Sequence, residues 1–342
     1  MSFFLKTLLM KQIIRRKQKK QPFDYAAGEA FALPADADAV VNNSYYFSAH
    51  STEGESLYCR LGLRSVHSEV WFAYARDGRL YTHNTLLYKE NAPLTVSRCE
   101  EGWAFAFRGP LTADDGSEVE AEFDGLFTSQ EAPVDFFSHM PPIRTARAMA
   151  GERWSREFFA EMQKNNQVHY EQTGRLRGTL TLNGEVRELE LPCVRDHSFG
   201  RRVWGYMNNH LWLAAVNNTS QLNFSMVSYP AMTVLEVGNF KPTEGEMAYV
   251  LSAEYDRAAV IGEEIPRELS LTLRLTGGRV LHVLATCEHV TEYLFEGGNY
   301  RLLEGIGSFD INGVRYRGII EMGTNGCRDR IYNARDIKEL RA

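Results

Sequence analysis

Residues 193–206 (CVRDHSFGRRVWGY) hold the densest group of chemically active side chains in the sequence, with Asp196 between Arg195 and His197. A carboxyl group beside an imidazole has two catalytic uses. It can orient and charge the imidazole, or it can donate a proton itself where apolar walls raise its pKa. We therefore predict Asp196 as a general acid and His197 as the residue that tunes it. Aromatic side chains that could form the apolar walls are Trp204, Tyr206 and Trp212.

The same charges could instead hold the fold together. Arg195, Arg201 and Arg202 are each close enough in sequence to pair with Asp196. A buried ion network at the rim of a β-barrel can serve the structure alone. Because perturbed acids occur in such networks as well as in active sites, both interpretations stay open at this point.

Two further segments contribute candidate binding groups. Tyr45 and Tyr46 lie in NNSYYFSAH and must face opposite ways on a strand, so one hydroxyl points inward and needs a partner or a ligand. Glu321 alternates with Ile319 in GIIEMG, and one of these two faces inward. The predicted ligand-binding residues are Tyr45, Tyr46, Arg195, Phe199, Trp204, Tyr206, Trp212 and Glu321.

Short strands must position these residues. From residue 34 to residue 132, segments with period-two alternation follow one another and are separated by turn signals such as Asp77-Gly78 and Asp115-Gly116. Aromatic and β-branched residues fill them, which is typical of strands. The pattern predicts an antiparallel β-meander of about five to seven strands over residues 34–132.

A linker with a helix is predicted over residues 133–173. Trp154, Phe158 and Met162 recur at helical spacing in residues 152–172, and His169 and Tyr170 are expected to end this helix. Strands resume at residue 174 and continue to residue 342, with tight hairpins expected at Asn183-Gly184, Gly277-Gly278 and Asn312-Gly313. The predicted fold class is all-β: two antiparallel β-barrels joined by a short helical linker.

Residues 1–33 form a separate basic and apolar segment. Seven of the 38 Lys and Arg residues lie in residues 1–20, which contain no acid, and the apolar residues come before most of the basic ones. A secretory signal has the opposite order, and no apolar run reaches the ~20 residues that span a bilayer. Peripheral membrane contact through residues 1–20 and a helix packed on the protein body, or a frayed tail, are the open interpretations. We expect a cytoplasmic protein, peripheral to a membrane in the first case.

Several classes of function have no support in the sequence. The rest of the chain has 31 basic and 44 acidic residues, which argues against a nucleic-acid surface. There is no glycine-rich nucleotide motif, no H-E-x-x-H motif and no G-x-S-x-G motif. Five scattered cysteines without C-x-x-C spacing suit a reducing compartment. We therefore expect no metal, no cofactor and no nucleic-acid partner.

Four motifs in this order resemble a known superfamily: NNSYYFSAH, HYEQTGRLRGTLTLNGE, RDHSFG and GIIEMG. Together they resemble the two-domain lipocalin-like proteins, which include AttH-like proteins, carotenoid 1,2-hydratases and fungal survival-factor proteins. The resemblance spans roughly residues 35–335. Its most specific element is residues 195–198 (RDHS), which Trp-Gly usually follows in the family. Phe199 replaces that Trp here, so any role of an indole N–H at this position does not transfer.

The resemblance implies two barrels with a hydrophobic cavity between or within them. Members handle lipophilic molecules such as polyenes, polyketide chains and sphingolipids. Some are cofactor-free enzymes, and the survival-factor branch carries an amphipathic amino-terminal segment at membranes. Our first hypothesis is therefore binding of a hydrophobic small molecule in a β-barrel cavity. The alternative is a cofactor-independent hydratase, isomerase or cyclase that uses acid–base chemistry at Asp196 and His197.

Overall fold

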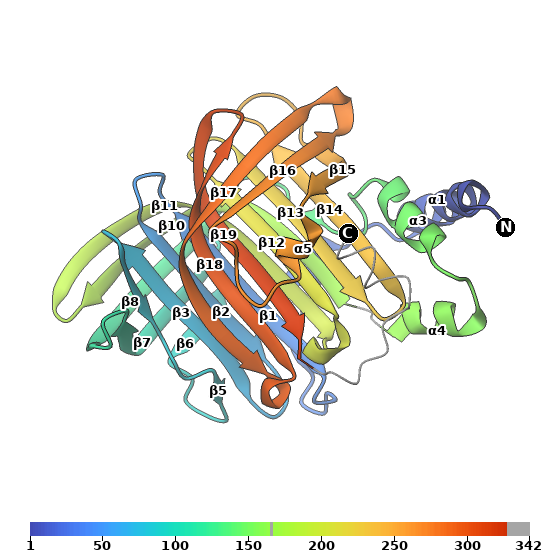
Figure 1. The fold of residues 1–342 in the computed structure, drawn as a ribbon. Helices are drawn as coiled ribbons and strands as arrows, with labels where there is room; N and C mark the ends of the chain where they lie inside the picture. Colours follow the sequence, from blue (N-terminus) through green and yellow to red (C-terminus); the bar gives the residue numbers. More distant parts are fainter. Residues whose placement is uncertain (165–166, 327–342) are drawn as a thin grey trace.

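The computed structural model describes residues 1–164 and 167–326, and Figure 1 shows two β-structures packed together. The first is an 11-stranded sheet whose main path runs β11-β1-β2-β3-β4-β7-β8-β10-β9. Because β10 also pairs with β11 along its whole length, the path of pairings returns to its starting strand. The second is a closed barrel of the strands β12 to β19 in chain order, in which β12 also pairs with β19.

All pairings in both structures are antiparallel. The first sheet contains β1 (Val41–His50), β2 (Ser56–Leu63), β3 (Ser68–Arg76), β4 (Arg79–Thr82), β5 (Leu87–Tyr88), β6 (Leu94–Arg98), β7 (Trp103–Ala113), β8 (Glu118–Thr128), β9 (Val134–Asp135), β10 (Gln167–Leu182) and β11 (Glu185–Arg201). The barrel contains β12 (Asn209–Val216), β13 (Gln221–Tyr229), β14 (Met232–Lys241), β15 (Ala248–Tyr255), β16 (Glu268–Leu275), β17 (Val280–Phe295), β18 (Tyr300–Ile311) and β19 (Val314–Asn325).

The described residues contain few helices, and these precede or connect the strands. They are α1 (Phe3–Lys20), α2 (Tyr25–Glu29), α3 (Pro142–Gly151), α4 (Arg156–Lys164) and α5 (Arg257–Val260), with short turns η1 (Trp204–Tyr206), η2 (Thr276–Gly278) and η3 (Glu296–Gly298). The mostly β fold and one closed barrel confirm the coarse prediction of fold class. The division into two domains stays a prediction.

The predicted hairpins form where glycine and asparagine allow a left-handed backbone. Asn183 and Gly184 have φ of 48° and 85° in the turn between β10 and β11. Asn312 and Gly313 have φ of 53° and 82° between β18 and β19. Two consecutive residues with positive φ match the right-handed twist of the strands, which is why these dipeptides favour two-residue hairpins.

The helical linker is shorter than the sequence predicts. Its helical pattern extends to residue 172, but α4 ends at Lys164 and β10 begins at Gln167. His169 and Tyr170 therefore lie on a strand, and the expectation that they end the helix is wrong. The apolar helical stripe stops at Met162, and the following residues instead find backbone partners on β11.

The first sheet also includes residues that we expected in the second β-domain. β10 pairs with β8 and β11 pairs with β1, so residues 174–201 belong to the first sheet rather than to the barrel. The hairpin at Asn183 joins β10 to β11. The outer edge of β10 pairs with β8, and the outer edge of β11 pairs with β1. The change from sheet to barrel comes between residues 201 and 209.

Buried side chains form one group inside each β-structure and another between them. Phe47 belongs to the group inside the first sheet, and Phe224 to the group inside the barrel. Tyr46, Trp71 and Trp212 belong to the group between them, which we call the interface group. Because side chains alternate along a strand, Phe47 and its neighbour Tyr46 serve different groups.

Helix α1 lies against α3 at one side of the molecule (Figure 1). Met10 and Ile14 of α1 pack with Ala146 and Met149 of α3. The Lys6 ammonium group donates a hydrogen bond to the main-chain oxygen of residue 152 over 2.6 Å. None of the described helices is both long enough and apolar enough to cross a bilayer.

Candidate functional site

A row of side chains crosses the face of the first sheet that meets the barrel. Strand register places Glu171 (β10), Asp196 (β11), Tyr46 (β1), Arg60 (β2) and Trp71 (β3) directly beside one another. Residues opposite each other in antiparallel strands share one face of the sheet. All five are at most 7 % exposed. The row therefore sets two carboxyl groups, a hydroxyl, a guanidinium and an indole into the buried interface.

A second row on the barrel faces the first. Trp212 (β12), Glu321 (β19) and Glu304 (β18) lie side by side in register. The Tyr46 hydroxyl donates to Glu304 Oε1, and the Tyr46 ring lies 5.3 Å from the Trp212 ring between centroids. The two rows are therefore in direct contact, with polar groups enclosed among aromatic rings.

Glu304 and Glu321 form a buried carboxyl pair. His210 Nε2 donates to Glu321 over 2.6 Å, and the Tyr300 hydroxyl lies 2.5 Å from His210 Nδ1. Burial raises the pKa of Glu304 well above its ordinary value, and the charge of Glu321 raises it further. Burial alone would raise the pKa of Glu321 too, but hydrogen bonds from His210 and Glu304 hold it below its ordinary value. A single proton on this pair is therefore favoured on Glu304.

His169, Glu171 and Asp196 form a cluster at the other end of the first row. His169 Nε2 contacts Asp196 Oδ2 and lies 3.6 Å from Glu171 Oε1. Burial alone would raise the pKa of Asp196, but the charges of His169 and Arg202 hold it below its ordinary value. Burial and the neighbouring Asp196 charge raise the pKa of Glu171 well above its ordinary value. Ligand atoms of the three cluster residues lie within 4.8 Å of one another, a spacing that suits a metal ion.

The structure does not bring the two predicted catalytic residues together. Asp196 and His197 are consecutive on β11 and point to opposite faces. His197 lies inside the first sheet, where its Nδ1 is 2.5 Å from the Tyr170 hydroxyl and its Nε2 is 2.8 Å from Asn43 Oδ1. Burial lowers the pKa of His197 to about 3, so its imidazole is neutral. The imidazole that contacts Asp196 is His169 instead.

Arg195 shares the inner face with His197 and pairs with Glu29 of α2 rather than with Asp196. Its two terminal nitrogens contact the two carboxylate oxygens, one of them at 3.1 Å. Trp103 Nε1 and the Tyr170 hydroxyl also donate to Glu29, over 2.8 Å and 2.7 Å. Arg195 and its partners therefore hold the segment before β1 onto the first sheet. This contact supports the interpretation that the charge of Arg195 stabilises the fold.

The remaining predicted residues divide between the two faces. Tyr45 stacks on the His197 ring inside the first sheet, at 4.5 Å between centroids. Phe199 stacks on Phe31 at 4.2 Å. Because odd-numbered positions of β1 and β11 turn away from the barrel here, these residues and Arg195 lie apart from the interface group.

Trp204, Trp212, Tyr46 and Glu321 are the predicted binding residues that do meet at the interface. Trp204 lies in η1 and stacks on Phe295 at 4.4 Å, while Tyr206 is half-buried and packs on Tyr229 at 5.6 Å. Within the described residues, the indole nitrogen of Trp204 has no hydrogen-bond partner. The interface thus contains an N–H donor that no described residue accepts from.

Sequence reasoning missed Glu304, His210, Glu171 and the true position of His169. A signal existed for Glu304, because it occupies an alternating position in the apolar strand YRLLEGIGSFDI. Glu171 and His169 share one face of HYEQ, but the helical interpretation of that stretch hid the spacing. Glu29 has no such signal, because it lies on a five-residue helix without periodicity.

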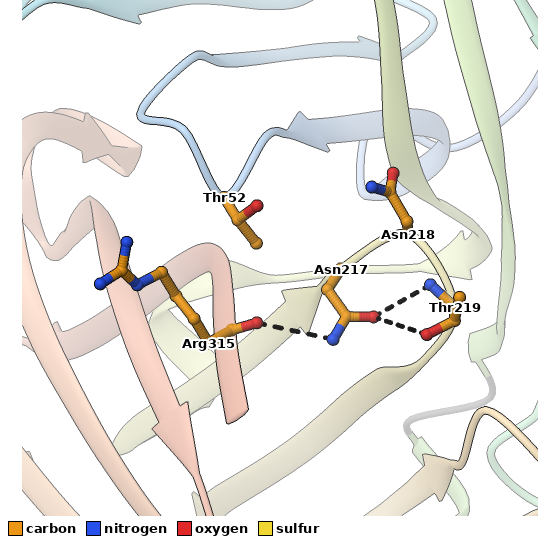
Figure 2. Close-up of a pocket in the computed structure, with 5 residues that line it drawn as sticks. All are labelled: Thr52, Asn217, Asn218, Thr219 and Arg315. Carbon is orange, nitrogen blue, oxygen red and sulfur yellow. Dashed lines mark hydrogen bonds between the residues drawn. The ribbon is translucent and has the colours of Figure 1, made fainter. Parts of the chain in front are cut away.

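Two surface pockets lie away from the interface. One, of about 440 Å³, is lined by Thr52, Arg315 and residues 217–219 at the turn between β12 and β13 (Figure 2). Its polar groups already bond one another: Asn217 Oδ1 accepts from the Thr219 main-chain nitrogen over 2.9 Å. The other lies over β16, β17 and β18 and includes Asp310. Neither is the expected hydrophobic cavity, and aromatic rings fill the space around Tyr46.

Two solved structures share this fold over most of the chain. An AttH-like protein of Nitrosomonas europaea is 10 % identical, with a TM-score of 0.55, covering 85 % of this chain and 96 % of its own. Kievitone hydratase of Nectria haematococca is 11 % identical, with a TM-score of 0.54, covering 90 % and 95 %. These likenesses confirm the resemblance in fold that the sequence motifs predict. No curated protein sequence matches the chain.

A family model, described as a domain of unknown function (DUF7064), matches residues 26–326. This range begins before Glu29 and includes both carboxyl clusters and every strand of the sheet and the barrel. The chain is therefore a member of the DUF7064 family.

Proposed function

We propose that this chain binds an unsaturated hydrophobic molecule between the first sheet and the barrel and donates a proton to it from Glu304. The carboxyl pair carries the proposal, because the pKa of Glu304 is raised and that of Glu321 is lowered, which makes Glu304 the proton donor of the pair. Two buried acids that share one proton are costly for stability, and such arrangements cluster at functional sites. We place the substrate at this pair because aromatic rings surround it.

The groups around the pair suit acid catalysis. When Glu304 gives its proton to a carbon–carbon double bond, the Tyr46 hydroxyl remains in place to donate to the new carboxylate. The face of Trp212 can stabilise the positive charge that forms on the substrate. In one outcome, water adds to that cation and gives a proton to Glu321. In the other, the carbon next to the cation gives a proton to Glu321 and no water adds. The first outcome is hydration and the second is isomerisation.

Hydration comes first among these reactions because one structural neighbour is a kievitone hydratase. That likeness is one of fold, so the substrate itself is not carried over. Access requires movement, since Tyr46, Trp71 and Trp212 fill the interface. A substrate must therefore displace aromatic side chains or separate the sheet from the barrel near residue 204.

The test compares Glu304→Gln with the wild-type protein on a panel of unsaturated lipophiles that includes kievitone. Turnover is followed by mass spectrometry, and binding by quenching of tryptophan fluorescence. We expect Glu304→Gln to lose about 100-fold or more in rate while it binds within a few-fold of wild type. Tyr316→Phe removes a buried hydroxyl that bonds Ser220 inside the barrel, away from the carboxyl pair and the interface group, and serves as the control. Unchanged turnover in Glu304→Gln, or an equal loss in Tyr316→Phe, contradicts the proposal.

Binding without chemistry is the second candidate function, and the interface group favours it. Aromatic contact gives affinity of roughly 25 cal/mol per Å² of apolar surface before the costs of association. A wild-type protein that co-purifies with a lipophile and turns over no member of the panel supports this candidate. Glu304→Gln then changes affinity little.

We also propose that α1 contacts the surface of anionic membranes. Large apolar side chains are exposed in residues 1–13, which precede and begin α1: Met1, Phe3, Phe4, Leu5, Leu8, Leu9 and Ile13. Basic side chains of its second half are exposed as well: Arg15, Arg16, Lys17, Lys19 and Lys20. Apolar insertion together with a basic run is the combination that binds anionic lipid surfaces.

Co-sedimentation with vesicles tests this contact. The wild-type chain should bind vesicles that contain phosphatidylserine and lose that binding at high salt. Phe4→Glu with Leu8→Glu should abolish it, because both positions face away from α3. Binding that survives the double substitution contradicts the role of α1.

A further inference from the structure

The His169–Glu171–Asp196 cluster is not used by the proton transfer at Glu304. His169 and Glu171 are two residues apart on β10, and Asp196 is directly opposite Glu171 on β11, so strand register fixes all three. Their ligand atoms lie within 4.8 Å of one another. The His169 ring stacks on Phe136 at 4.3 Å between centroids with an angle of 9°, which fixes the plane of the imidazole.

Two carboxyl groups this close are costly in a buried site. Glu171 is 2 % exposed and Asp196 is 7 % exposed, so little water screens their mutual repulsion. His169 lies beside both carboxyl groups, and the charge of Arg202 also acts on Asp196. A divalent cation would balance both charges and turn the repulsion into attraction.

Two buried amides on the barrel add an independent observation. Asn223 of β13 reaches across and contacts Glu171 Oε2 through Nδ2, while its Oδ1 has no partner among the described residues. Asn239 lies directly opposite Asn223 on β14, and neither Oδ1 nor Nδ2 of its side chain has a hydrogen-bond partner among the described residues. Both amides are at most 1 % exposed. Buried polar atoms are nearly always satisfied by protein, water or an ion.

The Asn223 amide can supply a fourth ligand atom. Rotation about its last bond exchanges Oδ1 and Nδ2, since the two atoms are nearly equal in shape. The rotated amide presents an oxygen beside Glu171 in place of an N–H. The imidazole nitrogen and the two carboxylates of β10 and β11 then have an amide oxygen of β13 beside the Glu171 carboxylate.

We propose that His169, Glu171 and Asp196 bind a divalent metal ion of the Zn²⁺ or Mn²⁺ type, with Asn223 as a further ligand. The imidazole nitrogen favours these ions over Ca²⁺ and Mg²⁺, which prefer oxygen alone. Because three ligands come from the first sheet and Asn223 from the barrel, the bound ion joins the two β-structures. This inference does not rest on the proposed proton transfer.

The metal content of the tag-free full-length chain tests the proposal. The protein is treated with chelator and titrated separately with Zn²⁺ and with Mn²⁺ by calorimetry, and thermal unfolding is recorded with each. We expect one ion per chain and a higher midpoint of thermal unfolding. His169→Gln and Asp196→Asn should each weaken binding by about tenfold or more. Glu304→Gln, which changes another buried carboxyl of the same interface, should bind the ion like wild type.

Circular dichroism shows whether each variant is folded. The His169 side chain is 32 % exposed, so His169→Gln is informative even where Asp196→Asn does not fold. A chelated wild-type chain that binds neither ion overturns the proposal, and so do variants that bind as tightly as wild type. Loss of turnover in Glu304→Gln without any metal binding would refute the ion site and leave the proposed function intact.

Discussion

Replacing Glu29 and Arg195, singly and together, tests the conclusion that this buried pair serves the fold. Their side chains are 3 % and 1 % exposed, and the guanidinium lies 4.8 Å from the Trp103 ring. Glu29→Met leaves Arg195 as an unpaired buried charge. Arg195→Met leaves the carboxylate with neutral donors such as Trp103 and Tyr170 in place of the guanidinium. Breaking a buried pair in this way costs about 3–5 kcal/mol of unfolding free energy.

The double variant should cost much less than the sum of the two single variants. Removing both charges leaves no unpaired charge in the buried site, and methionine fills a volume similar to that of either side chain. What remains is the loss of the Glu29 acceptor for the Trp103 indole and for the Tyr170 hydroxyl, which keeps its contact with His197, at about 1 kcal/mol each. We therefore expect the Glu29→Met/Arg195→Met protein to lose about 2 kcal/mol, against about 6–10 kcal/mol for independent effects.

Urea unfolding of the four proteins, followed by fluorescence and circular dichroism, gives the coupling energy. Hydrogen exchange adds a local measurement, because the pair holds α2 on the first sheet and its loss should speed exchange over residues 25–31. Single variants that cost below about 1 kcal/mol, or a double variant that costs the full sum, would refute the argument. Either result would return Arg195 to the candidate ligand-binding groups.

Three further predictions follow from single positions. Burial and the nearby Arg317 charge lower the pKa of His50 to about 3, so the folded state binds fewer protons than the unfolded state between pH 6.5 and about 3. Wild type should therefore lose about 1.4 kcal/mol per pH unit more than His50→Asn as pH falls through that range, measured by urea unfolding. Gly318→Val should open the barrel, because a Cβ there would lie 1.9 Å from the Ala214 oxygen; Gly109→Ala, with no atom nearer than 3.6 Å, is the control in thermal unfolding. Asn183→Ala should cost about 1 kcal/mol in urea unfolding, since φ is 48° at that turn, and no loss would contradict the strain.

The strands and hairpins were predictable because their causes are local. Alternation of apolar residues over residues 56–127 and the Asn183-Gly184 dipeptide each act over a few neighbours. The helix that the sequence extends to residue 172 shows the limit. Gln167 to Leu182 become a strand because β8 and β11 provide backbone partners on both sides, and these partners are not visible from local periodicity.

The site was predictable in composition and not in arrangement. Asp196, Tyr46, Trp212 and Glu321 were expected to be buried polar or aromatic groups, and they meet at the interface. Pairing Asp196 with His197 used nearness in sequence, but consecutive residues on a strand face opposite ways. Rows across neighbouring strands, not runs along one strand, bring the chemical groups together here.

The sequence by itself determined that this chain forms β-structure with ionisable side chains in its interior, because alternation, turn residues and burial patterns are local properties. The tertiary structure alone decided which acid meets which partner. Glu304 finds Tyr46 across 258 residues and Arg195 finds Glu29 across 166. Such contacts depend on strand register and on how the sheet lies against the barrel, and no short segment of the chain encodes either one.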